Sequence, residues 1–137
     1  MKLFPLATVV ALALSAAACS GNDGEIKLES VNTPLTDQGK DTLFNLEIIK
    51  ARDGGYAAGT IKVKVTPVGR DAIEVSCVLS DVNGNKIVDV GDKLACAEGA
   101  ENKLGADSAG KKATVELFAT IEGSEERVGD ATWTPAK

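Results

Sequence analysis

The sequence predicts an all-β fold, a small antiparallel β-sandwich or barrel of about six to seven strands. Three observations lead to this prediction. Apolar and polar residues alternate with a period of two, turn signals separate the alternating segments, and no segment has a convincing helical period. The chain after its first residues has the length of a single domain.

The first three strands are expected in the N-terminal half. Residues 25–31 (EIKLESV) form a short candidate. Residues 42–49 (TLFNLEII) and 59–69 (GTIKVKVTPVG) alternate clearly, and each places three large apolar residues on one face: Phe44, Leu46, Ile48 in the first and Ile61, Val63, Val65 in the second. Each is therefore expected to have one buried and one solvated face.

Three more strands follow, at residues 72–80 (AIEVSCVLS), 113–123 (ATVELFATIEG) and 127–133 (RVGDATW). Turn signals separate the strands at 32–34, 52–55, 67–71 and 122–126. Residues 97–112 contain several glycines and little apolar period, so we interpret them as a loop. Trp133 is expected to pack in the core near the C-terminus.

The N-terminus has the layout of a bacterial export signal. Met1 and Lys2 precede an apolar run at 3–14 and small residues at 15–18, and the run is too short to span a bilayer. The stretch LSAAACSG resembles a bacterial lipobox, which implies that Cys19 becomes the lipidated first residue of the mature chain. Residues 1–18 are then the signal peptide, 19–24 a lipid-anchored tether and 25–137 a single β-domain. The resemblance implies a cell-envelope location at the outer membrane, whereas ordinary cleavage after Ala18 would leave a soluble periplasmic or secreted protein.

The cysteine count agrees with lipidation. The chain has three cysteines, so one is left over when a pair forms. If Cys19 is acylated, Cys77 and Cys96 can form a disulfide in an oxidising compartment.

Residues 80–94, SDVNGNKIVDVGDKL, place a carboxylate or carboxamide at nearly every second position. Counted from Asp81, they match the ligand positions 1, 3, 5, 7, 9 and 12 of an EF-hand loop with Asp81, Asn83, Asn85, the carbonyl of Ile87, Asp89 and Asp92. The loop most resembles the calcium loop of dockerin modules, although neither a second loop nor the following helices are visible. Lys86 replaces the glycine of position 6, so the local path is expected to differ. With two neutral asparagines, the loop predicts one weak Ca²⁺ site.

Two other interpretations of this stretch remain. Asn83 and Gly84 could form a two-residue hairpin, or the loop could be merely solvated and acidic. The cysteines favour the closed loop. A tight hairpin would leave Cys77 and Cys96 about 20 Å apart, beyond the reach of a disulfide, whereas a closed loop over 81–92 brings them directly opposite each other.

Composition excludes several functions. The chain has no histidine, which excludes Ser-His catalysis and histidine-ligated zinc. Its net charge of −5 and lack of a basic patch argue against nucleic acid. The acids Glu74, Glu116, Glu125 and Glu126 are interpreted as solvated, and the sequence indicates no protein or glycan partner and no oligomeric state.

The best-fitting class is therefore a non-catalytic, lipid-anchored cell-envelope protein, a calcium-stabilised binding or structural module. Two alternatives stay open. One is a small carboxylate-dependent hydrolase, and the other is a β-barrel carrier of an apolar ligand, which would need an open interior lined by Ile, Val and Phe.

Overall fold

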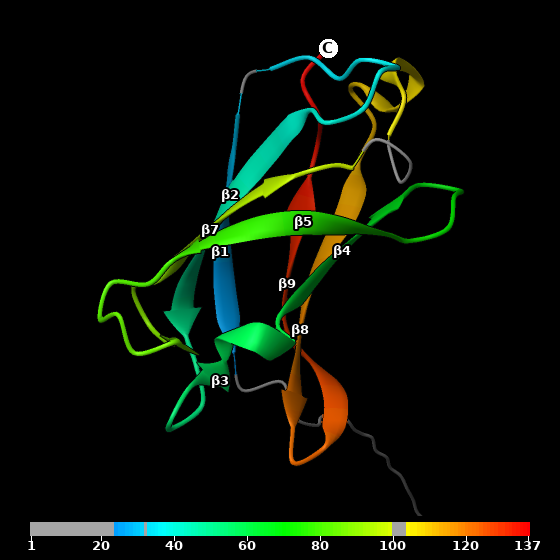
Figure 1. Cartoon of the computed structure of the whole chain (residues 1–137). Coiled ribbons are helices and arrows are strands. Elements are labelled where there is room, and N and C mark those ends of the chain that lie inside the picture. The colour runs from blue at the N-terminus through cyan, green and yellow to red at the C-terminus, as the bar shows by residue number, and fades with distance from the viewer. Residues whose placement is uncertain (1–23, 32, 100–103) are drawn as a thin grey trace, which may run out of the picture.

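A computed structural model describes residues 24–31, 33–99 and 104–137 (Figure 1). The predicted signal peptide 1–18, Cys19 and all of the tether except Gly24 lie outside the described residues. The described chain forms strands and two short 3-10 turns: β1 (Glu25–Ser30), β2 (Thr42–Lys50), β3 (Tyr56–Ala57), η2 (Ala58–Thr60), β4 (Lys62–Pro67), β5 (Ile73–Ser80), β6 (Ile87–Val88), β7 (Lys93–Ala97), η3 (Ala106–Ser108), β8 (Ala113–Ile121) and β9 (Ser124–Trp133).

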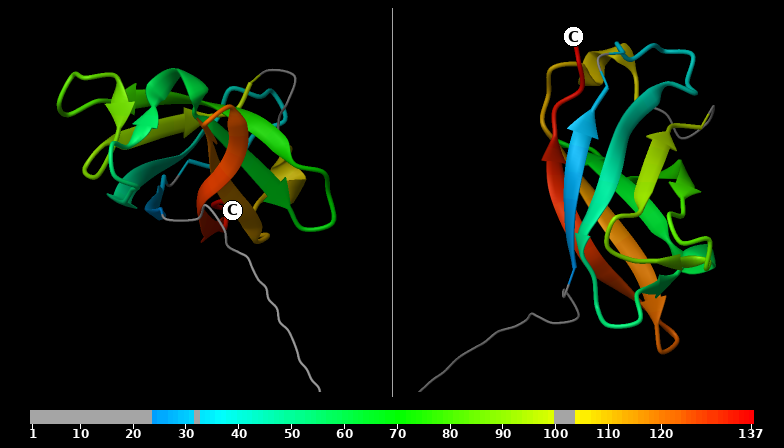
Figure 2. Two further views of the ribbon diagram at one scale, coloured as in Figure 1. Left: turned by 90° about the horizontal axis from the view of Figure 1, so that it is seen from below. Right: turned by 90° about the vertical axis from the view of Figure 1, so that its left-hand side faces the viewer.

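The predicted all-β fold is confirmed. Seven strands form one antiparallel sheet in the order β1-β2-β7-β5-β4-β8-β9, and β3 pairs with β6 in a separate two-stranded sheet. The two end strands, β1 and β9, contact each other, so the sheet is nearly closed into a barrel (Figure 2). At this junction the indole Nε1 of Trp133 donates a hydrogen bond to Ser30 Oγ at 3.2 Å.

The strand order of the main sheet can be compared with that of a constant-type immunoglobulin domain. If β1, β2, β4, β5, β7, β8 and β9 are lettered A to G, the order is A-B-E-D-C-F-G. Constant-type immunoglobulin domains place A-B-E-D in one sheet and C-F-G in the other. Here the two sets are joined through β4 and β5, where Val63 faces Val75 and Val65 faces Ile73. The Greek-key path thus brings segments distant in sequence side by side.

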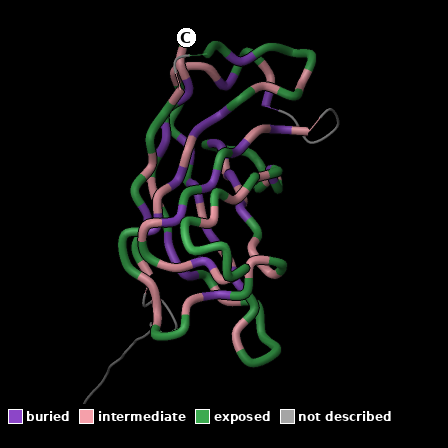
Figure 3. The backbone as a smooth tube through the Cα atoms, turned by 60° about the vertical axis from the view of Figure 1, so that its left-hand side comes forward, coloured by how far each residue is buried: buried purple, intermediate pink, exposed green. Residues whose placement is uncertain are grey.

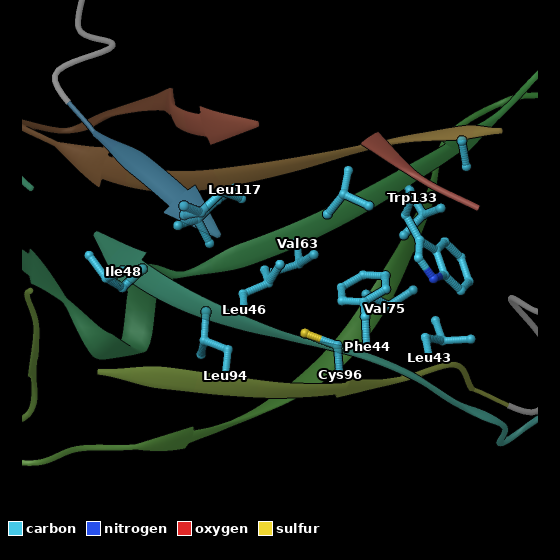
Figure 4. Close-up of a cluster of buried hydrophobic side chains, with 14 of the residues drawn as sticks. Leu43, Phe44, Leu46, Ile48, Val63, Val75, Leu94, Cys96, Leu117 and Trp133 are labelled. Atoms are coloured by element: carbon cyan, nitrogen blue, oxygen red, sulfur yellow. The ribbon is translucent and has the colours of Figure 1, made fainter. Parts of the chain in front are cut away.

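Most of the residues that the alternation predicted to face the core are buried, whereas Ile61 is partly exposed; Figure 3 shows the burial of each residue along the backbone. Phe44, Leu46 and Ile48 of β2 are at most 1% exposed. Trp133 packs edge-on against Phe44 with ring centroids 5.0 Å apart, and both lie near Leu43 toward one end of the core (Figure 4). One small cavity of about 90 Å³ is lined by both charged and apolar residues, among them Lys62 of β4, Glu74 of β5 and Leu94 of β7.

All six predicted strands are present, with differences at their bounds. Strand β9 begins at Ser124, because the turn after β8 needs only Glu122 and Gly123, both with positive φ. Strand β7 was not among the predicted strands because it is short and follows directly on the polar loop. The segment predicted as a loop at 97–112 contains the short turn η3 and no strand beyond Ala97 among its described residues.

Candidate functional site

The register of β5 and β7 defines the polar loop. Cys77 faces Cys96 and Ser80 faces Lys93, the last pair before the strands separate. Residues 81–92 therefore form a closed loop, and the two-residue hairpin at Asn83 is not formed. The predicted disulfide is confirmed, because Cys77 and Cys96 are bonded with an S–S distance of 2.02 Å.

The second half of the loop is attached to the body of the protein. Its strand β6 pairs with β3, so that Ile87 faces Ala57 and Val88 faces Tyr56. Val88, the apolar residue at position 8 of the loop, is fully buried, and Tyr56 is 3% exposed. Residues 91 and 92 continue the sheet, because Gly91 N donates to Ile48 O and Ile48 N donates to Asp92 O, both at 2.9 Å. The loop is thereby held in a defined shape.

Asp81 organises the first half of the loop. Its Oδ1 accepts hydrogen bonds from the backbone N of Asn83 at 3.2 Å and of Gly84 at 3.0 Å, and its Oδ2 accepts one from Lys86 N at 2.6 Å. Lys86 has φ of 60°, the left-handed conformation for which position 6 of an EF-hand loop uses glycine. The sharp turn is therefore made here by a lysine, despite its steric cost.

Asp92 closes the loop from inside the protein. Its side chain is fully buried, and it joins the two halves of the loop: Oδ1 accepts from Val82 N and Oδ2 from Asp89 N, both at 2.9 Å. A buried carboxylate with only backbone amide partners retains an uncompensated charge. Among the described residues, no lysine or arginine forms an ion pair with Asp81, Asp89 or Asp92.

Asp89 lies next to Asp92 and is half-buried. Its Oδ1 is shielded from solvent and has no hydrogen-bond partner among the described residues. Burial, followed by the adjacent carboxyl of Asp92, raises the pKa of Asp89, and Asp81 adds further repulsion. The side-chain amide of Asn85 acts in the opposite direction. Asp89 is thus an acid whose surroundings disfavour its charge, as expected near other carboxylates without a cation.

The structure brings together some of the predicted ligands and separates others. Asn83, Asn85, Ile87 and Asp89 line one open cleft of about 420 Å³, whose opposite wall is the turn at 51–55. Asp81 and Asp92 are instead directed at the backbone amides of the loop. Within the described ranges, no three acidic, cysteine or histidine side chains converge closely enough to hold an ion.

The acids considered for hydrolysis lie mainly in ion pairs on the outer surface. Glu116 contacts Arg127 at 3.2 Å, and Glu125 contacts Lys62 at 3.5 Å and Lys64 at 3.7 Å. Glu74 is exposed, and Glu126 is partly buried. These positions agree with their interpretation as solvated residues of strands and turns.

Sequence reasoning missed a different carboxyl pair, Asp41 and Glu98. Glu98 is only 3% exposed, and its Oε2 accepts a hydrogen bond from Leu104 N at 2.7 Å. Burial raises the pKa of Glu98 to about 7, and the carboxyl of Asp41 contributes in the same direction. In sequence, Glu98 is one acid of a polar loop, so no local pattern marks it as buried.

Comparison of the chain with protein-family models, curated proteins and solved structures finds no match. In the part of the chain that the structure describes, no helix has the length and apolar character needed to cross a bilayer.

Proposed function

We propose that this protein is a non-catalytic, lipid-anchored component of a bacterial cell envelope, a binding or structural module whose loop at residues 81–92 binds one calcium ion. The observation that carries the calcium proposal is the charge of the loop. The carboxyl groups of Asp92 and Asp81 add to burial in raising the pKa of Asp89, yet none of the three has a cationic partner in the described structure. A divalent cation would compensate this charge.

The available atoms favour calcium over other metals. Every candidate ligand is an oxygen, and calcium takes six to eight oxygens in flexible geometry. The cleft gives an ion access to Asn83, Asn85 and Asp89. Asp81 and Asp92 keep unused lone pairs on oxygens that already accept amide hydrogen bonds, so small rotations could bring them to the ion. Because these carboxylates must partly leave their amides, binding is expected to be weak, with a Kd of about 10⁻⁴ M.

Two features favour this function over the alternatives. Of the acids considered for hydrolysis, Glu116 and Glu125 are paired with arginine or lysine and Glu74 is exposed, which favours solvated surface roles over catalytic ones. Phe44, Leu46 and Val65 are fully buried in the described core, which favours a packed interior over the open apolar lumen that a carrier of apolar molecules would need.

The lipid anchor is proposed from the lipobox-like residues before Cys19. Strand β1 begins at Glu25, so a tether of residues 19–24 would hold the β-domain close to the membrane surface. An outer-membrane location is part of this proposal. The alternative is ordinary signal cleavage, which would release a soluble periplasmic or secreted domain with the same fold.

Thermal melting of the purified protein, first in chelator and then in calcium, tests the ion site. At a Kd of about 10⁻⁴ M, 1 mM calcium adds about 1.4 kcal/mol to the free energy of unfolding, because only the native state binds the ion. The expected rise in Tm is about 3 to 6 °C. Magnesium should have a smaller effect, because it demands near-octahedral geometry and dehydrates reluctantly.

The variant Asp89→Asn separates ion binding from a structural role. It keeps an oxygen at the loop but removes a charge, so in chelator its Tm should equal or exceed that of the wild type. The calcium-dependent rise should be lost. Asp130→Asn is the matched control, because Asp130 lies outside the loop beside Arg127, and it should retain the rise. Identical wild-type melting curves in chelator and calcium, with no heat of binding by calorimetry, would contradict the calcium site.

A further inference from the structure

Asp41 and Glu98 face each other at one end of the barrel. Glu98 N donates to Asp41 O at 3.0 Å, which continues the β2 to β7 ladder beyond its last pair, Thr42 and Ala97. Lys40 N adds a longer contact to Gly99 O at 3.4 Å. The two carboxyl groups are therefore cross-strand neighbours, an arrangement in which two negative charges repel, and burial increases the cost.

A single proton resolves this repulsion. Glu98 Oε1 is buried and has no hydrogen-bond partner among the described residues. If Glu98 is protonated, Oε1 can donate a hydrogen bond to the Asp41 carboxylate. The proton belongs on Glu98, because Asp41 stays charged through hydrogen bonds from Thr36 N at 2.7 Å and Thr36 Oγ1 at 3.1 Å. In agreement, the pKa of Glu98 is raised, while the backbone and hydroxyl of Thr36 help to lower that of Asp41.

Two other charged groups in the described part of this end, Asp37 and Arg70, have partners of their own. The carboxylate of Asp37 accepts from Ala106 N at 2.9 Å. Arg70 contacts Ser108 Oγ at 3.2 Å and Asp107 at 3.8 Å. Among the described residues, Asp41 is the charged group that acts on Glu98.

The pair joins segments that cover the apolar interior. Asp41 holds Thr36, which follows the buried Leu35, and Glu98 holds the backbone of the buried Leu104. Two residues before Glu98, the disulfide at Cys96 fixes β7 to β5. If the contacts around Glu98 break, opening is therefore expected to stop at the disulfide and leave the sheet intact.

We propose that the proton shared by Glu98 and Asp41 is a pH-sensitive latch. While it is bound, Leu104 and the segment 35–41 stay closed over this end of the barrel. When it is lost, two buried carboxylates face each other, and their repulsion is relieved by opening this end to water. The sheet remains folded, so the change is local.

The size of the pH effect on opening follows from the coupling between opening and proton binding at Glu98. The closed state holds its proton near neutral pH, whereas an open, solvated Glu98 ionises at the ordinary pKa of 4.5. Between these two values the opening constant rises about tenfold per pH unit, and it then levels off. Between pH 5 and pH 7.5 we therefore expect the protection of the Leu104 and Thr36 amides to fall by a factor of more than about ten.

Hydrogen exchange of the purified protein, followed by NMR at several pH values, tests the latch. Glu98→Gln is the reference at each pH, because its amide mimics the protonated carboxyl. The intrinsic chemical dependence of amide exchange on pH is the same in the wild type and the variant, so it cancels in the ratio of their exchange rates. The ratio of wild-type to variant exchange at Leu104 and Thr36 should rise through this range, and both amides should exchange faster than Leu117 in β8, which is expected to exchange by global unfolding. If Glu98→Gln does not fold, Asp41→Asn takes its place, because it removes the repulsion from the other side. A constant ratio at Leu104, or exchange of Leu104 and Thr36 as slow as that of Leu117 at every pH, would overturn the proposal.

Discussion

Replacing Glu98 with glutamine should change how the stability of the whole domain depends on pH. Glu98 has a raised pKa of about 7 in the folded protein, compared with an ordinary value of 4.5. At 1.36 kcal/mol per pH unit, this difference corresponds to about 3 kcal/mol. The folded state binds the proton more tightly, so this stabilisation is fully present below pH 4.5 and is lost as the pH rises to about 7. If only the end of the barrel around Glu98 opens, the loss of stability is limited to the free energy of that local opening.

Asp41 contributes in a different pH range. Its pKa is lowered from 3.8 in the folded protein, so its stabilising effect is present above that value and is lost only in stronger acid. A slope between pH 5 and pH 7 therefore does not come from Asp41. Asp89, whose pKa is also raised, acts in the same direction as Glu98, so the contribution of Glu98 is the difference between the slopes of the wild type and Glu98→Gln. A free energy of unfolding that falls as the pH rises is unusual for a carboxyl group, since most acids stabilise the fold as the pH rises.

Urea denaturation at pH 5, 6, 7 and 8, followed by circular dichroism, measures this dependence. We expect the free energy of unfolding of the wild type to fall with pH and that of Glu98→Gln to fall less steeply. The two proteins should be similar at pH 5, and the variant should be the more stable one at pH 8. A wild-type free energy that is constant over this range, or an equal slope in both proteins, would refute the assignment of a buried, protonated Glu98.

Three further predictions concern the anchor, the bridge and the loop. Cys19→Ser should abolish incorporation of a labelled fatty acid and membrane association, and absence of label in the wild type would contradict the lipoprotein proposal. Replacing Cys77 and Cys96 together with serine should lower the free energy of unfolding by about 3 kcal/mol, because the bridge closes a long loop, and urea denaturation measures the loss. Lys86→Gly should raise the stability in chelator by up to about 1 kcal/mol, since glycine adopts the left-handed conformation without strain, and an unchanged or lower Tm would contradict this reasoning.

Much of the fold was predictable from sequence because its signals are local. Alternation in residues 42–49 and 113–123 identifies β2 and β8 together with their buried faces. The spacing of Cys77 and Cys96 around the polar loop predicted their register, because a disulfide requires close Cα atoms. The ligand pattern from Asp81 to Asp92 was likewise visible as a spacing.

Tertiary structure decided which acids are buried and what each one contacts. Val88 is buried because β6 pairs with β3, and Asp92 is buried because the loop folds back on β2, although both lie in a largely polar stretch of the sequence. Asp41 and Glu98 are far apart along the chain and become neighbours only because β2 pairs with β7. The pKa of a carboxyl group depends on burial and on charges from other strands, so the latch at Glu98 could not be read from a linear pattern.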